Sequence, residues 1–127
     1  MKTLKFYKFL AKTGQLKITI EGNSMLPVLK NGDIINVSKI TTFVPGTVIL
    51  FVFRNQLVVH RLIKIEGNVL YCKGDNSFVI EKIDRESVIG EVKVFCRNDR
   101  VYEIVPKSYE EVEYYFQLFK QLSINSK

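Results

Sequence analysis

A serine lies between a glycine and a proline, in a segment that follows an alternating apolar run. Ser24 comes two residues after Gly22 and three before Pro27, and the apolar run spans residues 16–20. Pro27 fixes its own φ and restricts the residue before it, so a helix should not run through this point. A strand that enters such a turn can hold a serine hydroxyl rigidly, with backbone amides free beside it. This geometry suits a nucleophile with an oxyanion hole, and an ordinary polar surface turn is the alternative interpretation.

A serine hydroxyl needs a base to become a nucleophile, and the chain has a single histidine to supply one. His60 ends the apolar run 57–59, where a histidine is often only a packed, hydrogen-bonded residue. An ordinary imidazole titrates near neutral pH, so it can accept the Ser24 proton and return it to a leaving amine. Asp75, in the turn sequence 73–76, is the expected third group that orients the imidazole, and a simple Asx turn is the other interpretation of this sequence.

The composition limits the other kinds of site. The chain has 127 residues with a net charge of +6, and its lysines are spread along the sequence. Its length and ordinary apolar content predict a single domain over residues 1–127, and the diffuse charge favours a solvated basic surface over a nucleic-acid interface. Cys72 and Cys96 stand apart and no second histidine accompanies them, so we expect no metal site and no cofactor.

The N-terminal region predicts a helix rather than a targeting segment. No stretch approaches the roughly 18 apolar residues of a membrane span, and the core of a signal peptide is absent, so we expect a soluble, cytoplasmic protein. Residues 4–11 predict a short amphipathic helix with Leu10 on its apolar face. Its polar side carries Lys5, Lys8 and Lys12. Packing on the domain is the simpler role for this helix, and peripheral contact with a membrane surface is the alternative.

The middle of the chain alternates apolar runs with turn signals. The expected strands span residues 34–37, 47–53, 57–65, 69–72 and 88–96. The stretch 81–87 is polar and precedes the last of these strands. Turn signals at this spacing predict a mainly β fold, with a curled antiparallel sheet or partial barrel.

Residues 108–122 predict a C-terminal helix. Ser108 stands three residues before Glu111, which is the pattern of a capping box. A stripe of apolar side chains recurs at helical spacing, formed by Tyr109, Val112, Phe116, Phe119 and Leu122. Such a stripe usually packs on the core of its own domain, and docking against another chain or peptide is the alternative.

Five short blocks occur in order along the chain. They are Gly22-x-Ser24-Met25-x-Pro27, Gly32-Asp33, Val59-His60-Arg61, Lys73-Gly74-Asp75-Asn76 and Ile89-Gly90. Together they resemble the type I signal peptidases and the related self-cleaving SOS repressors, over about residues 22–94. The resemblance implies a serine protease of the signal-peptidase type, with a β-rich catalytic core at about residues 15–97.

The resemblance also implies roles for single residues. Ser24 would be the nucleophile. Bacterial signal peptidases carry a lysine base where this chain has His60, so the histidine points to the Ser–His branch typical of endoplasmic-reticulum and archaeal-like enzymes. Asp75 matches the acid of the Gly-Asp-Asn block. Glu81 and Asp84 are further candidates for the acid that orients the imidazole.

The same resemblance assigns the segment around the serine to substrate binding. The residue two before the nucleophile often lines the oxyanion hole in these proteins. Here it is Gly22, which offers only its backbone, so the Ser24 amide would matter more. Met25 and Pro27 belong to the same substrate-binding segment. A peptide would lie as an added strand along an exposed sheet edge.

Two departures from the family bear on function. Signal peptidases are commonly tethered by a transmembrane helix, which the sequence does not show. The SOS repressors carry a DNA-binding domain, which the 21 residues before Gly22 are too short to hold. We therefore expect a stand-alone endopeptidase that cleaves a peptide or leader segment. A non-catalytic module that binds a peptide or a partner protein is the alternative.

Overall fold

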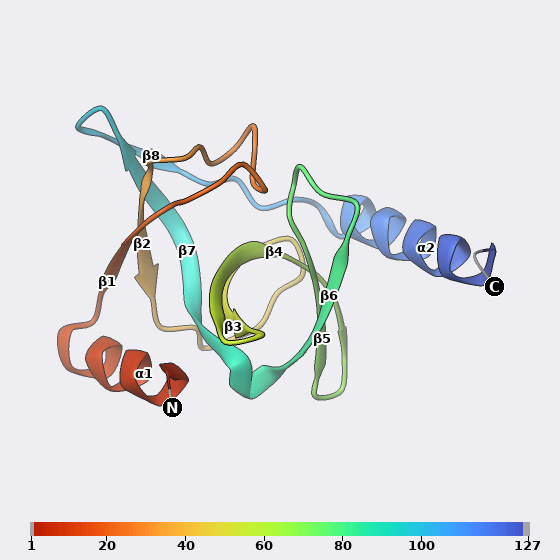
Figure 1. The fold of residues 1–127 in the computed structure, drawn as a ribbon, viewed down its shortest axis with the longest axis horizontal. Helices are drawn as coiled ribbons and strands as arrows, with labels where there is room; N and C mark the ends of the chain where they lie inside the picture. The colour runs from red at the N-terminus through yellow and green to blue at the C-terminus, as the bar shows by residue number, and fades with distance from the viewer. Residues whose placement is uncertain (1, 126–127) are drawn as a thin grey trace.

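The computed structural model describes residues 2–125, which form one antiparallel sheet with a helix at each end of the chain (Figure 1). The elements are α1 (Lys2–Thr13), β1 (Leu16–Thr19), β2 (Ile34–Ser38), β3 (Val48–Phe53), β4 (Gln56–Glu66), β5 (Val69–Lys73), β6 (Ile80–Asp84), a 3-10 turn (Arg85–Ser87), β7 (Val88–Arg97), β8 (Arg100–Glu103) and α2 (Tyr109–Asn125). The strands follow the order β1-β2-β7-β3-β4-β5-β6, and β8 pairs with β7. The prediction of a mainly β fold, with a curled antiparallel sheet and helices at both ends, is confirmed.

Strand β4 changes its partner along its length. Its first half pairs with β3 through residues 56–61, and its second half pairs with β5 through residues 61–66. Figure 1 shows β3 and β4 at the centre, between the β1–β2–β7 side of the sheet and the β5–β6 hairpin. Within the described chain, residues 57–60 therefore keep one edge without a neighbouring strand. His60 lies at the end of this free edge, just before β5 joins.

Strand β6 is not expected from the sequence, because its residues read as polar. In the structure Glu81 and Ile83 are buried, while Lys82 and Asp84 are exposed. The alternation of a strand is therefore present, but one of its inward positions holds a carboxylate. A buried carboxylate needs a partner, because an unpaired charge away from water is costly.

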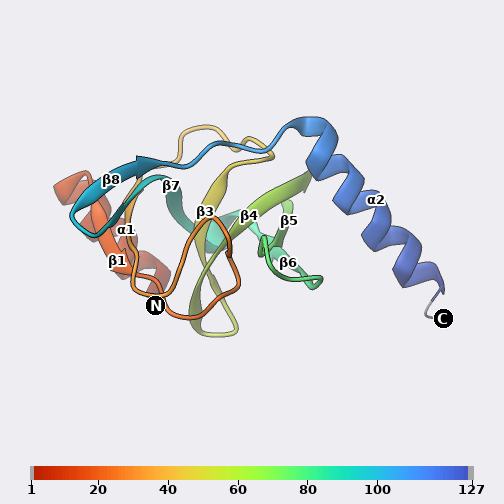
Figure 2. The same ribbon diagram turned by 90° about the horizontal axis from the view of Figure 1, so that it is seen from above.

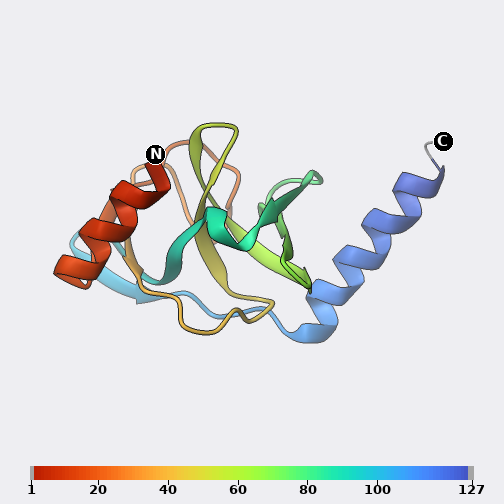
Figure 3. The same ribbon diagram turned by 90° about the horizontal axis from the view of Figure 1, so that it is seen from below.

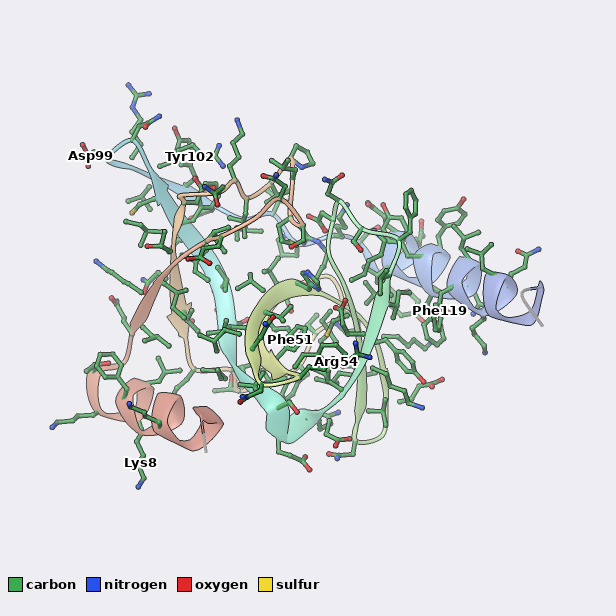
Figure 4. All side chains as sticks on the ribbon, viewed as in Figure 1. Lys8, Phe51, Arg54, Asp99, Tyr102 and Phe119 are labelled. Atoms are coloured by element: carbon green, nitrogen blue, oxygen red, sulfur yellow. The ribbon has the colours of Figure 1, made fainter. Side chains whose placement is uncertain are left out.

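Helix α1 packs on the sheet through Leu10, which is buried in the main apolar cluster. The side chains of Lys5, Lys8 and Lys12 are exposed, and Figure 4 shows Lys8 pointing away from the body of the protein. Contact of this helix with a membrane stays a prediction. Among the helices of residues 2–125, none combines the length and apolar character needed to cross a bilayer.

Helix α2 packs part of its apolar stripe on β4 and β5. Val112 and Phe116 are buried there, in a cluster with Ile63 of β4. Figures 2 and 3 show the far end of the helix projecting away from the sheet. The two ends of the expected stripe, Tyr109 and Leu122, are exposed. The middle of the stripe is thus core, and its ends are surface.

Candidate active site

The segment that carries Ser24 is a loop closed at its base. The Ile20 N–H donates to the Asp33 carbonyl oxygen at 2.7 Å, and the Gly32 N–H donates to the Ile20 carbonyl oxygen at 2.8 Å. Between these bonds the chain turns at Gly22, whose φ of +88° lies in the left-handed region that favours glycine. The Ser24 hydroxyl is therefore carried by a short loop with both ends fixed beside β1 and β2.

Three side chains form a chain of hydrogen bonds. Nε2 of His60, on β4, lies 3.1 Å from Oγ of Ser24. Nδ1 of His60 lies 2.5 Å from Oε1 of Glu81, on β6. An ionised carboxylate can only accept a hydrogen bond, so Nδ1 carries the proton and Nε2 is left to accept the serine hydroxyl. The structure thus brings together the serine and the histidine that the sequence singles out, and both His60 and Glu81 are buried.

Asp75 is not the carboxylate that contacts His60, in contrast to the sequence-based expectation. Its two oxygens accept hydrogen bonds from Nε and Nη2 of Arg61, at 2.8 and 2.7 Å. Nη1 of Arg61 donates to the Gly46 carbonyl oxygen at 2.8 Å. Consecutive residues of a strand point to opposite faces, so His60 and Arg61 pair with different acids.

Glu81, one of the two further acids considered, takes the place expected for Asp75. The pleat of β6 explains why it does so and Asp84 does not, because Glu81 faces inward and Asp84 is exposed. Glu81 also lies opposite Cys72 of β5, which in turn lies opposite Leu62 of β4. The curl of these three strands carries the Glu81 carboxylate to the imidazole.

The turn after β5 holds the serine from the other side. The Asn76 backbone N–H donates to the Ser24 carbonyl oxygen at 2.8 Å, and its side-chain amide donates to the Asn23 carbonyl oxygen at 3.2 Å. Gly74 packs so closely that an added Cβ would lie 2.6 Å from the Ser24 carbonyl oxygen and 3.1 Å from Nε2 of His60. The turn therefore contacts Ser24 and His60 through its backbone, and this close approach requires a residue without a side chain at position 74. The residue type alone does not reveal this role.

An open groove of about 430 Å³ runs past the serine, between the end of β1 and the free edge of β4. Its lining is mostly apolar and consists of Ile18, Thr19, Ile20, Glu21, Ser24, Met25, Leu50, Leu57, Val58, Val59 and His60. Of the residues expected to bind substrate, Met25 is buried at the wall of this groove. Gly22 and Pro27 are outside its lining.

The backbone amides near the serine differ in whether they are available to a ligand. The Gly22 N–H donates to Oδ1 of Asn31 at 2.9 Å, so it is occupied. The Ser24 N–H has no hydrogen-bond partner among the described residues. A free amide on the residue that carries the hydroxyl is the arrangement an oxyanion hole needs.

Other nucleophiles and metal ligands are poorly placed. Burial raises the pKa of the Cys72 thiol well above its ordinary value, so its thiolate is scarce at neutral pH. In the part of the chain that the structure describes, no group of three histidine, cysteine or acidic residues could hold a metal ion. The chemistry of the groove therefore centres on Ser24, His60 and Glu81.

Comparison with known proteins gives a family match over most of the chain. A family model described as Peptidase S24-like matches residues 5–106 of the chain. The matched region contains all three residues of the hydrogen-bonded chain and ends before α2. A search of curated proteins gave no match.

Proposed function

Because the chain belongs to the Peptidase S24-like family, we propose that it is a serine endopeptidase with Ser24 as nucleophile and His60 as general base. The observation that carries the proposal is the 3.1 Å contact between Ser24 Oγ and His60 Nε2. This distance lies within the range over which a base can take a proton from a nucleophile.

The geometry supports the following sequence of steps. Nε2 of His60 takes the Ser24 hydroxyl proton as Oγ attacks the peptide carbonyl carbon, and the Ser24 N–H donates to the oxyanion that forms. Glu81 keeps the imidazole in the required tautomer and stabilises the imidazolium. His60 then gives the proton to the leaving amine, the C–N bond breaks, and an acyl-enzyme remains. Water then gives a proton to His60 and attacks the ester carbonyl carbon, the C–O bond to Ser24 breaks, His60 returns the proton to Oγ of Ser24, and the new peptide acid leaves.

The free edge of β4 supplies the means of holding a peptide. An extended chain can lie in the groove and form backbone hydrogen bonds with residues 57–59, as an added strand does. The apolar lining from Ile18, Met25 and Leu50 would take its side chains. The scissile carbonyl would then lie between the Ser24 hydroxyl and the imidazole.

The test compares cleavage by wild type and Ser24→Ala. Both are incubated with a mixture of extended peptides that includes leader-like segments, and products are identified by mass spectrometry. Ser87→Ala, in the 3-10 turn (Arg85–Ser87) that follows β6, is the matched control. We expect defined products with wild type and the control, and none with Ser24→Ala. Equal cleavage by Ser24→Ala would exclude Ser24 as nucleophile, and binding of peptides without cleavage by wild type would favour a non-catalytic binding module.

A further inference from the structure

Helix α2 begins after the last residue matched to the family, but one of its side chains reaches the turn beside the serine. The Tyr115 ring lies 4.6 Å from Nζ of Lys73. The Lys73 ammonium donates to the Gly74 carbonyl oxygen at 3.1 Å. Gly74 in turn packs against the Ser24 carbonyl oxygen and the His60 ring. A continuous series of contacts therefore runs from α2 to the proposed catalytic residues.

The Lys73 ammonium is partly buried. This burial lowers its pKa, because the charged form loses hydration there, although the nearby Asp75 and Glu111 carboxylates favour the charge. Both carboxylates are engaged with other groups, Asp75 in its paired bonds with Arg61 and Glu111 in an ion pair with Lys107. An ammonium that is short of water gains most from the face of an aromatic ring, and Tyr115 provides that face.

Tyr115 is itself fixed in place. Its hydroxyl donates to Oε2 of Glu111 at 3.1 Å, and the same oxygen accepts a hydrogen bond from Nζ of Lys107 at 2.7 Å. The Lys107 backbone N–H donates to the Gly46 carbonyl oxygen at 3.0 Å, and this carbonyl also accepts from Arg61. The start of α2 is thus joined to the buried ion pair that holds the turn.

We propose that Tyr115 is a positioning residue for the peptidase site. By holding the Lys73 ammonium against the Gly74 carbonyl, it keeps the turn pressed on Ser24 and His60. This inference rests on the function proposed above. Neither Tyr115 nor Lys73 lines the groove, so their substitution should lower turnover and leave peptide binding nearly unchanged.

The first measurement is of kcat and KM for a cleaved peptide. We expect Tyr115→Ala to lower kcat about tenfold with KM changed less than about twofold; tenfold corresponds to about 1.4 kcal/mol, within the range of a desolvated cation–π contact. Tyr115→Phe keeps the ring and should retain most of the activity. Tyr109→Ala is the control, because Tyr109 is 65% exposed on the same helix and should leave both constants unchanged.

A double variant tests whether Tyr115 acts through Lys73. Lys73→Met keeps the aliphatic stem and removes the charge, and should lower kcat about as much as Tyr115→Ala. If one residue acts through the other, Lys73→Met/Tyr115→Ala loses no more than the larger single variant. Losses that add, or a kcat for Tyr115→Ala equal to that of wild type, would overturn the proposal.

The single histidine gives a readout that does not need turnover. The imidazole signals of His60 can be assigned without ambiguity in a carbon–proton NMR spectrum, at a temperature where circular dichroism shows every variant folded. We expect Tyr115→Ala to shift these signals and Tyr109→Ala to leave them in place. Unchanged signals in Tyr115→Ala would overturn the positioning role. Shifted signals in a protein whose wild type cleaves no peptide would support the positioning role and refute the proposed function alone.

Discussion

Two arginine–aspartate pairs hold the two backbone segments that meet at Ser24, and they differ in how far water reaches them. Arg97 binds both oxygens of Asp33, at 2.8 and 2.6 Å, at the base of the serine loop. Arg61 binds Asp75 in the same two-pronged way and fixes the turn on the other side. The Arg97 side chain is 26% exposed, and that of Arg61 is 2% exposed. The two ion pairs have the same chemistry, but removing the aspartate from each should therefore cost different amounts of folding free energy.

The surroundings of the two guanidinium groups increase the expected difference in the cost of removing each aspartate. Arg97 lies 5.0 Å from the centre of the Phe95 ring and 5.9 Å from that of Tyr102, and Figure 4 places Tyr102 toward the outer end of the sheet. Without its aspartate, Arg97 would keep these rings and its contact with water. Arg61 would instead remain as a buried charge with only carbonyl oxygens beside it, which is the costly case.

The largest effect is expected from Asp75→Ala. Removing one partner of a buried ion pair typically costs about 3–5 kcal/mol of folding free energy, because the other charge is left unpaired. The variant should also lose most peptide cleavage, since the turn is no longer tied to β4. Urea unfolding measures the first effect, with Asp84→Ala at the exposed end of β6 as control. A loss of folding free energy below about 1 kcal/mol, which is typical of an exposed ion pair, would show that the Arg61–Asp75 pair does not behave as a buried one.

A smaller loss of stability is expected from Asp33→Ala. Arg97 keeps its contacts with the Phe95 and Tyr102 rings and with water, although the Lys30 backbone N–H loses the Asp33 oxygen that accepts its hydrogen bond at 2.7 Å. The free energy of unfolding should fall by less than half of the loss seen for Asp75→Ala under the same conditions. Equal losses for the two variants would show that exposure to water does not separate the pairs.

The smallest expected effect is on the way the free energy of unfolding depends on pH. The hydrogen bond from Arg97 holds the pKa of Asp33 below its ordinary value of 3.8. A carboxylate with a lowered pKa stabilises the fold fully above its ordinary value, and this stabilisation is lost as the pH falls through the value in the folded protein. Urea unfolding at about pH 6 and about pH 3 should therefore show a steeper acid loss in wild type than in Asp33→Asn. Parallel losses in the two proteins would exclude this contribution.

The sequence predicts those parts of the fold and the site that depend on a single residue type or on a regular spacing of apolar residues. The serine loop, the lone histidine and the two helices follow from Ser24, His60 and the periodic apolar residues. The sequence favours Asp75 as the acid beside the histidine, with Glu81 and Asp84 as further candidates, and in the structure Glu81 takes this place for a physical reason. Glu81 occupies an inward position of β6 that an apolar residue would normally mark, so the strand itself read as a polar connection. Asp75 stood in the expected block, but its carboxylate faces Arg61.

Other parts of the site depend on contacts between distant segments. Gly74 matters for the close approach of its backbone to the serine loop, which only the folded chain shows. Tyr115 stands outside the predicted apolar stripe of the C-terminal helix, and residue spacing does not identify the lysine that its ring contacts. The curl of the sheet determines which distant residues form such contacts, and the spacing of residues along the sequence does not predict them.

Acylation of the serine tests the central claim most directly, which is that His60 activates Ser24. Wild type, Ser24→Ala and His60→Ala are incubated with an activated peptidyl ester, and the adduct is followed by intact mass and located by peptide mapping. We expect one acyl group on Ser24 in wild type, none at this position in Ser24→Ala, and acylation at least about a hundredfold slower in His60→Ala. An adduct on another residue, or equal rates in wild type and His60→Ala, would contradict the account.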